Sequence, residues 1–181
     1  MRSILGAVLA VVILCGCSGQ PSTAPNEPAV RLVESLGGTV TRDDKQPGKP
    51  VIGVNLSGHG PHRDVSDADL KELKEFKHLT TLNLYECGNV TDDGVKELKE
   101  LKQLTSLSLG HTKVTDAGLT ELKELKQLTT LDLSHTQVTD AGLKELTELK
   151  QLTTLHLRNT KVTDGGVKEL KEALPQCQIN Q

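Results

Sequence analysis

Two near copies of one short segment contain the residue types of a hydrolytic site. Residues 110–118 read GHTKVTDAG and residues 134–142 read SHTQVTDAG. A serine hydrolase needs its nucleophile and its base within hydrogen-bond reach of each other. Ser134 and His135 are chain neighbours whose side chains point in different directions, and Asp140 stands at a predicted helix start. We therefore predict that this chain is not an enzyme and has no catalytic residue.

The paired histidines raise the alternative of a metal site. His111 and His135 occupy the same position in consecutive copies, so their side chains could approach one ion, and His59 and His62 lie close together in another segment. Zinc sites use three or four protein ligands, and neither pair has an evident third. We expect solvated imidazoles, with no metal and no cofactor, and keep a metal-binding or hydrolytic site around His111 and His135 as a less favoured alternative.

The segments belong to a longer repeat. Leu79, Leu104, Leu128 and Leu152 start successive copies at steps of 25, 24 and 24 residues, and residues 104–127 and 128–151 are identical at 18 of 24 positions. Each copy reads L-x-x-L-x-L, then V-T-D-x-G-[LV], then a short helical pattern. The alternation predicts a strand buried on one face, and the threonine and aspartate predict an N-capped helix. The predicted helix caps are Ser66, Thr91, Thr115, Thr139 and Thr163.

A single coil of this kind cannot bury its own apolar face, so the copies must stack. The copy LTTLNLYECGNVTDDGV, residues 79–95, resembles the cysteine-containing subclass of leucine-rich repeats. The resemblance implies an α/β leucine-rich-repeat solenoid, a short horseshoe of about five coils plus caps, with a parallel concave β-sheet and convex helices. It also implies that Thr112, Thr136 and Thr160, which replace Cys87 in later copies, hydrogen-bond the turn backbone of the adjoining coil.

The N-terminus is typical of an export signal. Arg2 precedes an apolar run over residues 4–14, which is too short to span a bilayer. The run ends in Leu-Cys-Gly-Cys, which resembles a bacterial lipobox and implies lipidation of Cys17. Ser18 in place of Asp implies the outer rather than the inner membrane. We expect an exported, lipid-anchored protein of the cell envelope, with an ordinary secretory signal as the alternative.

Composition and repeat register divide the chain into five segments. The 181 residues have a net charge of −3 and only 1% aromatic residues, which fits one regularly stacked domain and gives no basic footprint for nucleic acid. The predicted segments are a lipoprotein signal peptide (1–16), a flexible tether (17–27), an N-terminal cap (28–50), leucine-rich repeats (51–173) and a C-terminal cap strand (174–181).

Differences between copies indicate where a ligand would bind. Half of the differences between residues 104–127 and 128–151 fall at outward strand positions, where the fold tolerates change. We predict a monomer that binds an unknown protein partner there, with a structural spacer as the alternative and, by resemblance alone, a ubiquitin-ligase adaptor as a third. His156 lies one coil from Asp132, close enough to pair with it. The predicted contact residues are Asn83, Tyr85, Ser108, Asp132, Ser134, His156 and Arg158.

Overall fold

The computed structural model describes residues 26–58 and 65–181. The predicted signal peptide, Cys17 and most of the tether lie outside the described residues, as do His59 and His62. Among the described residues, no helix has both the length and the apolar character needed to cross a membrane.

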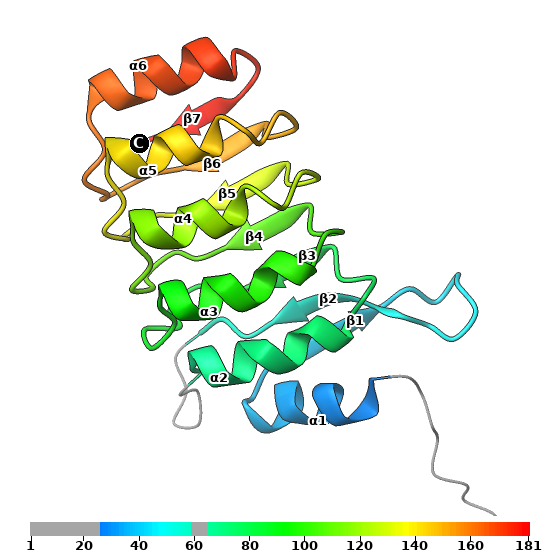
Figure 1. Ribbon diagram of the computed structural model, residues 1–181. Helices are drawn as coiled ribbons and strands as arrows, with labels where there is room; N and C mark the ends of the chain where they lie inside the picture. The colour runs from blue at the N-terminus through cyan, green and yellow to red at the C-terminus, as the bar shows by residue number, and fades with distance from the viewer. Residues whose placement is uncertain (1–25, 59–64) are drawn as a thin grey trace, which may run out of the picture.

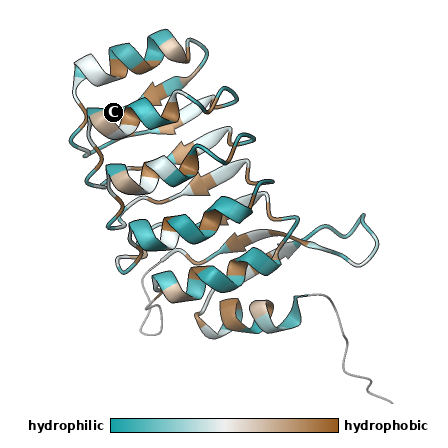
Figure 2. Cartoon of the chain, in the orientation of Figure 1, coloured by the Kyte–Doolittle hydropathy of each residue, from teal (hydrophilic) through white to brown (hydrophobic). Residues whose placement is uncertain are grey.

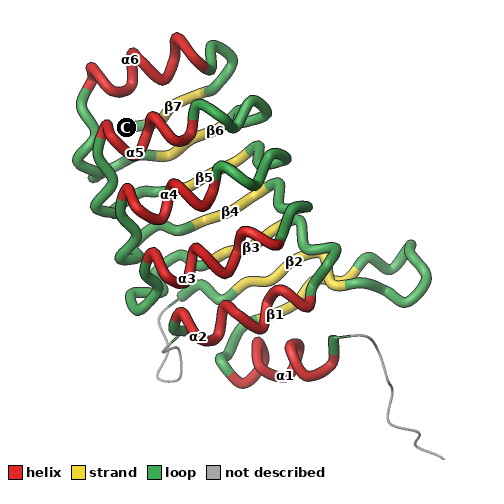
Figure 3. The backbone as a smooth tube through the Cα atoms, viewed as in Figure 1, coloured by secondary structure: helices red, strands yellow, loops and turns green. Residues whose placement is uncertain are grey.

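The described chain forms coils stacked along one axis (Figure 1). A seven-stranded sheet keeps its strands in sequence order, and helices cover one of its faces (Figure 3). Strands β2 to β7 are parallel, and β1 pairs antiparallel with β2. The strands are β1 Thr39–Arg42, β2 Val51–Asn55, β3 Thr81–Asn83, β4 Ser106–Ser108, β5 Thr130–Asp132, β6 Thr154–His156 and β7 Gln178–Asn180.

Each later coil pairs one strand with one short helix, and the predicted α/β leucine-rich-repeat solenoid is confirmed. Two of the helices, α2 and α3, continue into 3₁₀ turns at Lys71–Glu75 and Leu98–Glu100. The helices are α1 Glu27–Ser35, α2 Asp67–Leu70, α3 Asp92–Glu97, α4 Asp116–Leu122, α5 Asp140–Leu146 and α6 Asp164–Ala173.

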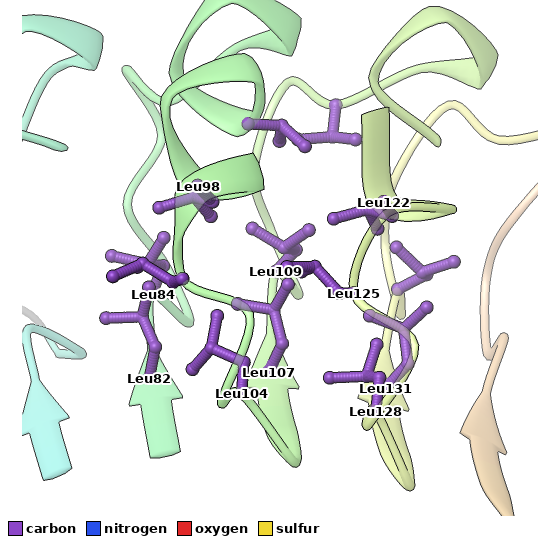
Figure 4. Close-up of a cluster of buried hydrophobic side chains, with 14 of the residues drawn as sticks. Leu82, Leu84, Leu98, Leu104, Leu107, Leu109, Leu122, Leu125, Leu128 and Leu131 are labelled. Atoms are coloured by element: carbon purple, nitrogen blue, oxygen red, sulfur yellow. The ribbon is translucent and has the colours of Figure 1, made fainter. Parts of the chain in front are cut away.

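Leucines fill the space between the sheet and the helices. Leu107 and Leu131 point inward from β4 and β5, and Leu98 and Leu122 meet them from the helical side (Figure 4). All four are at most 1% exposed. Burial of one such side chain stabilises the fold by about 1.5–3 kcal/mol. Hydrophobic and hydrophilic residues are interspersed along each coil (Figure 2), and the hydrophobic ones form one core cluster.

The N-terminal end of the stack is covered by α1 and β1. Helix α1 buries Ala29, Val30 and Val33 in the core cluster and ends before Gly37, which adopts a left-handed φ of 71°. This segment lies almost wholly within the predicted cap, residues 28–50. Its apolar face shields the first described coil from solvent at this end of the described stack.

The helix starts are joined from coil to coil by carboxylates. Asp92 accepts hydrogen bonds from the backbone N–H and the hydroxyl of Thr115 in the next coil, at 2.8 and 2.7 Å. Thr115 in turn caps its own helix by accepting from the N–H of Ala117. A Cβ on Gly118 would lie 2.5 Å from Asp92 Oδ1, so glycine leaves room for the carboxylate. We name this arrangement the aspartate ladder, formed by the pairs Asp67–Thr91, Asp92–Thr115, Asp116–Thr139 and Asp140–Thr163.

The ladder carboxylates thus do more than the predicted interaction with a helix dipole. The backbone N–H of Thr163, and then its hydroxyl, hold the pKa of Asp140 below its ordinary value of 3.8. The first cap differs, because Asp69 accepts from both the N–H and the hydroxyl of Ser66.

The expectation for the threonines that replace Cys87 is wrong. Thr112 and Thr136 donate to the carbonyls of Leu109 and Leu133 in their own coils, both at 2.6 Å. Thr160 bonds its own coil at Leu157 in the same way. A short hydroxyl side chain reaches the carbonyl three residues back, so the local bond forms in place of one between coils.

Both described cysteines are buried thiols. The Cys87 thiol donates to the carbonyl of Leu56 in the preceding coil, at 3.4 Å. Burial raises the pKa of the Cys177 thiol above its ordinary value of 9.0. Both act as small apolar groups in the core.

Candidate functional site

The sheet surface opposite the helices, here called the strand face, brings four of the predicted contact residues together. Strand pairing places Asn83 beside Ser108, Ser108 beside Asp132, and Asp132 beside His156. None of the four is buried. They come from β3 to β6 and form one polar column across the coils.

Within this column Asp132 and His156 bond other partners, so the predicted pairing of the two is wrong. Asp132 Oδ2 accepts from the Ser108 hydroxyl at 3.2 Å, and Oδ1 accepts from the backbone N–H of Ser134 at 2.9 Å. His156 Nδ1 lies 3.4 Å from Asn180 Nδ2. The carboxylate is bound to its own strand end because an Asp or Asn side chain readily bonds the N–H two residues on.

The bond from the Asp132 side chain to the backbone N–H two residues on recurs along the column. The side chains of Asn55 and Asn83 accept from the backbone N–H groups of Ser57 and Tyr85 in the same way. These short bonds fix the ends of the strands and leave the remaining polar groups of the column facing outward.

The three predicted contact residues nearer the strand ends differ in their exposure to solvent. Arg158 is exposed and Tyr85 is half-buried, whereas Ser134 is only 9% exposed, so its expected place on the open face is wrong. Strand β5 ends at Asp132, and Ser134 lies in the turn beyond it, where the alternation of a strand no longer applies.

Gly110 occupies the corresponding turn of the preceding coil, where it makes room for an aromatic ring. A Cβ on Gly110 would lie 2.7 Å from Cδ2 of Tyr85. The Tyr85 ring therefore lies across the strand end of the next coil.

A second column runs along the turns that follow the strands, and it contains His111 and His135, which the sequence placed at the same position of adjacent coils. His111, His135 and Asn159 have left-handed φ values of 56°, 58° and 54°. The His111 and His135 rings stack with centroids 3.8 Å apart and planes 17° apart, and the Tyr85 ring meets His111 edge-on at 5.2 Å. Asn159 Nδ2 lies 3.2 Å from His135 Nε2. We call Tyr85, His111, His135, Arg158 and Asn159 the turn column.

A signal for this column was present in the sequence. Asn159 stands where the two preceding copies have histidine, and Asn and His are enriched among residues that adopt a left-handed backbone. The shared backbone conformation gives His135 the structural role that its sequence position did not reveal.

The ring geometry bears on the metal alternative. A metal ligated by imidazole lies in the ring plane, along the nitrogen lone pair. The His111 and His135 rings are stacked and their planes are nearly parallel. No point within coordination distance of both rings therefore lies in both planes, and one metal ion cannot be bound by the two imidazoles in this arrangement. Among the described residues no group of three or more His, Cys, Asp or Glu side chains is placed to hold an ion.

Comparisons with known families identify the repeats. Residues 77–99 and 102–123 match a family described as "Leucine Rich repeat", and residues 126–164 match "Leucine Rich repeats (2 copies)". A search of curated proteins found no match.

The solved structures that resemble the chain include two internalins of Listeria monocytogenes and the Mex67:Mtr2 subunits of Chaetomium. Internalin C2 of Listeria monocytogenes is 19% identical with a TM-score of 0.48, covering 84% of this chain and 81% of its own. Internalin F of the same organism is 22% identical with a TM-score of 0.42, and the match covers 61% of this chain but 37% of that one. The Mex67:Mtr2 subunits of Chaetomium are 21% identical with a TM-score of 0.43, covering 50% of this chain and 69% of that one.

Proposed function

We propose that this leucine-rich-repeat chain is a non-catalytic protein-binding module of the bacterial cell envelope, anchored to the membrane through a lipidated Cys17. The partner is an unidentified protein that binds the strand face, and the chain acts as a monomer without a cofactor. Leucine-rich repeats are commonly built as protein-interaction scaffolds, and they offer an extended sheet surface for this purpose.

One observation carries the binding proposal. In the polar column of the strand face, Asn83, Ser108, Asp132 and His156 are adjacent and not buried, and all four differ in type from their neighbours. The leucines beneath them are nearly constant. Variation on an accessible surface above a nearly constant core is the pattern expected of a recognition surface.

Site-specific photo-crosslinking in cells that produce the protein tests the strand face. A photoreactive residue at Thr130, on the strand face, should capture a partner that the same residue at Glu148, in the turn after α5, does not. Ser108→Arg places a bulky charge in the middle of the column and should remove the crosslink. Gln127→Arg adds the same charge away from this face and should leave it. Identical products from both crosslinking positions would contradict the proposal.

The anchor rests on the N-terminal sequence, which resembles a lipobox, and needs its own test. Mass spectrometry of the mature protein should find a diacylglyceryl-modified Cys17, and Cys17→Ala should release the protein from the membrane fraction. An unmodified mature N-terminus contradicts the anchor and leaves export by an ordinary signal peptide. Separation of inner and outer membranes tests the proposed outer-membrane location.

The alternative is a structural spacer without a specific ligand. It is favoured if no crosslink forms from any strand-face position while deletion of the protein still changes the envelope. An ion or a reaction at His111 and His135 is less favoured because of the parallel rings. Elemental analysis of the purified protein, together with a His135→Asn variant, tests that possibility.

A further inference from the structure

The turn column presents a row of hydrogen-bond donors along one edge of the solenoid, at the left of Figure 1. Its donors are the phenol of Tyr85, the imidazoles of His111 and His135, the guanidinium of Arg158 and the amide of Asn159. His111, Arg158 and Asn159 are exposed, and Tyr85 and His135 are half-buried. Glu86 holds the position of His111 one coil earlier, with a left-handed φ of 66°, and adds a carboxylate at the N-terminal end of the row.

The row is held rigid by bonds between coils. The backbone N–H of His111 donates to the carbonyl of Ser134 at 2.9 Å, and that of His135 donates to Arg158 at 2.7 Å. These bonds fix the left-handed turns and with them the stacked rings. Rigid side chains lose little conformational freedom when a ligand binds, which favours recognition at this edge.

Permanent positive charges flank the row. Lys113 and Lys161 are exposed and follow His111 and Asn159 by two residues in the same turns. Of the ion pairs formed among the described residues, none involves Lys113, Arg158 or Lys161. These cations are therefore available to a ligand.

The nearest carboxylates keep their charge, but hydrogen bonds hold most of them in fixed places. Asp132 is bound to Ser108 and to the N–H of Ser134. Asp92, Asp116 and Asp140 point into the next coil, where each accepts from a threonine N–H and hydroxyl in the aspartate ladder. Two further acids lie in the turns that carry the row: Glu86, which is part of an interaction, and Asp164, which is exposed three residues after Lys161.

We propose that the turn column binds an extended, acidic segment of a partner protein. This inference rests on the proposed function, and it assigns a chemical class to the partner segment that binds at the turn column. Tyr85 and Asn159 are three coil steps apart, which is about 15 Å at about 4.8 Å per strand spacing. Four or five extended residues at about 3.4 Å each cover that length. Asp and Glu side chains on the segment accept from the donors of the row and pair with Arg158 and the two lysines.

An anionic bilayer is the other acidic surface that such an edge could meet. Lipid recognition by charge alone uses clusters of about four to eight Lys or Arg residues, whereas this edge has Lys113, Arg158 and Lys161. Stacked rings and an amide in fixed positions suit the defined geometry of a peptide better than a fluid headgroup layer. We therefore assign the edge to a protein ligand.

Selection from a displayed library of random dodecapeptides, with the full chain in detergent as bait, tests this assignment. The wild type should enrich peptides rich in Asp and Glu. Combined Lys113→Glu, Arg158→Glu and Lys161→Glu should weaken their binding about tenfold or more, since three exposed charge pairs are removed. The control combines Lys96→Glu, Lys123→Glu and Lys168→Glu, which are exposed on the helical side, and should bind as the wild type does.

A second variant separates the rings from the charges. His111→Asn with His135→Asn keeps a residue type that tolerates the left-handed turn, as Asn159 does, but removes the ring stack. Unchanged circular dichroism together with binding weakened several-fold supports the proposal.

The outcomes that overturn the inference are distinct from those that overturn the proposed function. Enrichment without acidic residues, or acidic peptides that bind the charge-reversed variant as well as the wild type, overturns the turn-column assignment. So does charge-dependent binding to phosphatidylglycerol vesicles without binding to acidic peptides. Peptides that require Ser108 and Asp132 but not the turn column overturn this inference and leave strand-face binding intact.

Discussion

The helix starts and the strand ends of this solenoid lie a few residues apart in each coil, but they differ in what they conserve from coil to coil. At the helix starts the same Asp, Thr and Gly recur, and the carboxylates are bonded into the next coil. At the strand ends the corresponding positions hold Tyr85, Gly110, Ser134 and Arg158. Constant residues stack the coils, whereas of the varied residues Tyr85 and Arg158 are accessible to a ligand and Ser134 is buried. The stability of variants in the two regions tests this division.

The largest effect is expected in the core beneath the strand face. Leu131 is fully buried, so Leu131→Ala leaves a cavity in the core. This substitution should lower the free energy of unfolding by about 2–5 kcal/mol. Thr130→Ala, on the opposite face of the same strand, should cost less than about 1 kcal/mol. Urea denaturation followed by circular dichroism measures both. Similar losses from the two variants would contradict the assignment of faces.

The next effect concerns the aspartate ladder. Asp116→Ala leaves the N–H and hydroxyl of Thr139 without their acceptor and should cost about 1–3 kcal/mol. Asp164→Ala is the matched control, because this last helix start accepts no described hydrogen bond from a following coil and contributes through the helix dipole alone, about 0.3–1 kcal/mol. Equal losses in urea denaturation would show that the bonds between coils add nothing.

A smaller effect is expected at the left-handed turns. His135→Val forces a β-branched residue to a φ of 58° and should cost about 1–2 kcal/mol, whereas His135→Asn should be close to neutral. Thermal unfolding of the two variants distinguishes strain in the turn from loss of the imidazole. A similar loss in both would assign the stability to the ring stack.

These cases show which parts of the structure the sequence could predict. The period of 24 residues and the alternation of leucines are enough to predict the stack, because each coil has only one apolar face to bury. The burial of Ser134 was missed because alternation was extended past Asp132, where the strand ends.

The partners of Asp132 and His156 were predicted wrongly for a related reason. Register places the two residues side by side, but a bond to the N–H two residues on competes for the carboxylate, and register does not reveal it. The ring stack depends on left-handed backbone at two histidines, which residue type favours but does not require.

The smallest effect concerns acid stability at the last rung of the aspartate ladder. Hydrogen bonds from Thr163 lower the pKa of Asp140 in the folded chain, so the carboxylate stabilises the fold above its unfolded pKa, and this contribution is lost as the pH falls through the folded pKa. The amide in Asp140→Asn does not titrate. Between about pH 5 and about pH 2.5, the urea concentration at the unfolding midpoint should therefore fall more for the wild type than for Asp140→Asn. Asp164→Asn is the matched control, because it removes a charge from a helix start without a bond to a following coil, and it should keep the pH dependence of the wild type. If Asp140→Asn follows the wild type across this range, the bonds from Thr163 do not favour the charged carboxylate, and the recurrence of aspartate at the helix starts reflects its fit beside glycine rather than its charge.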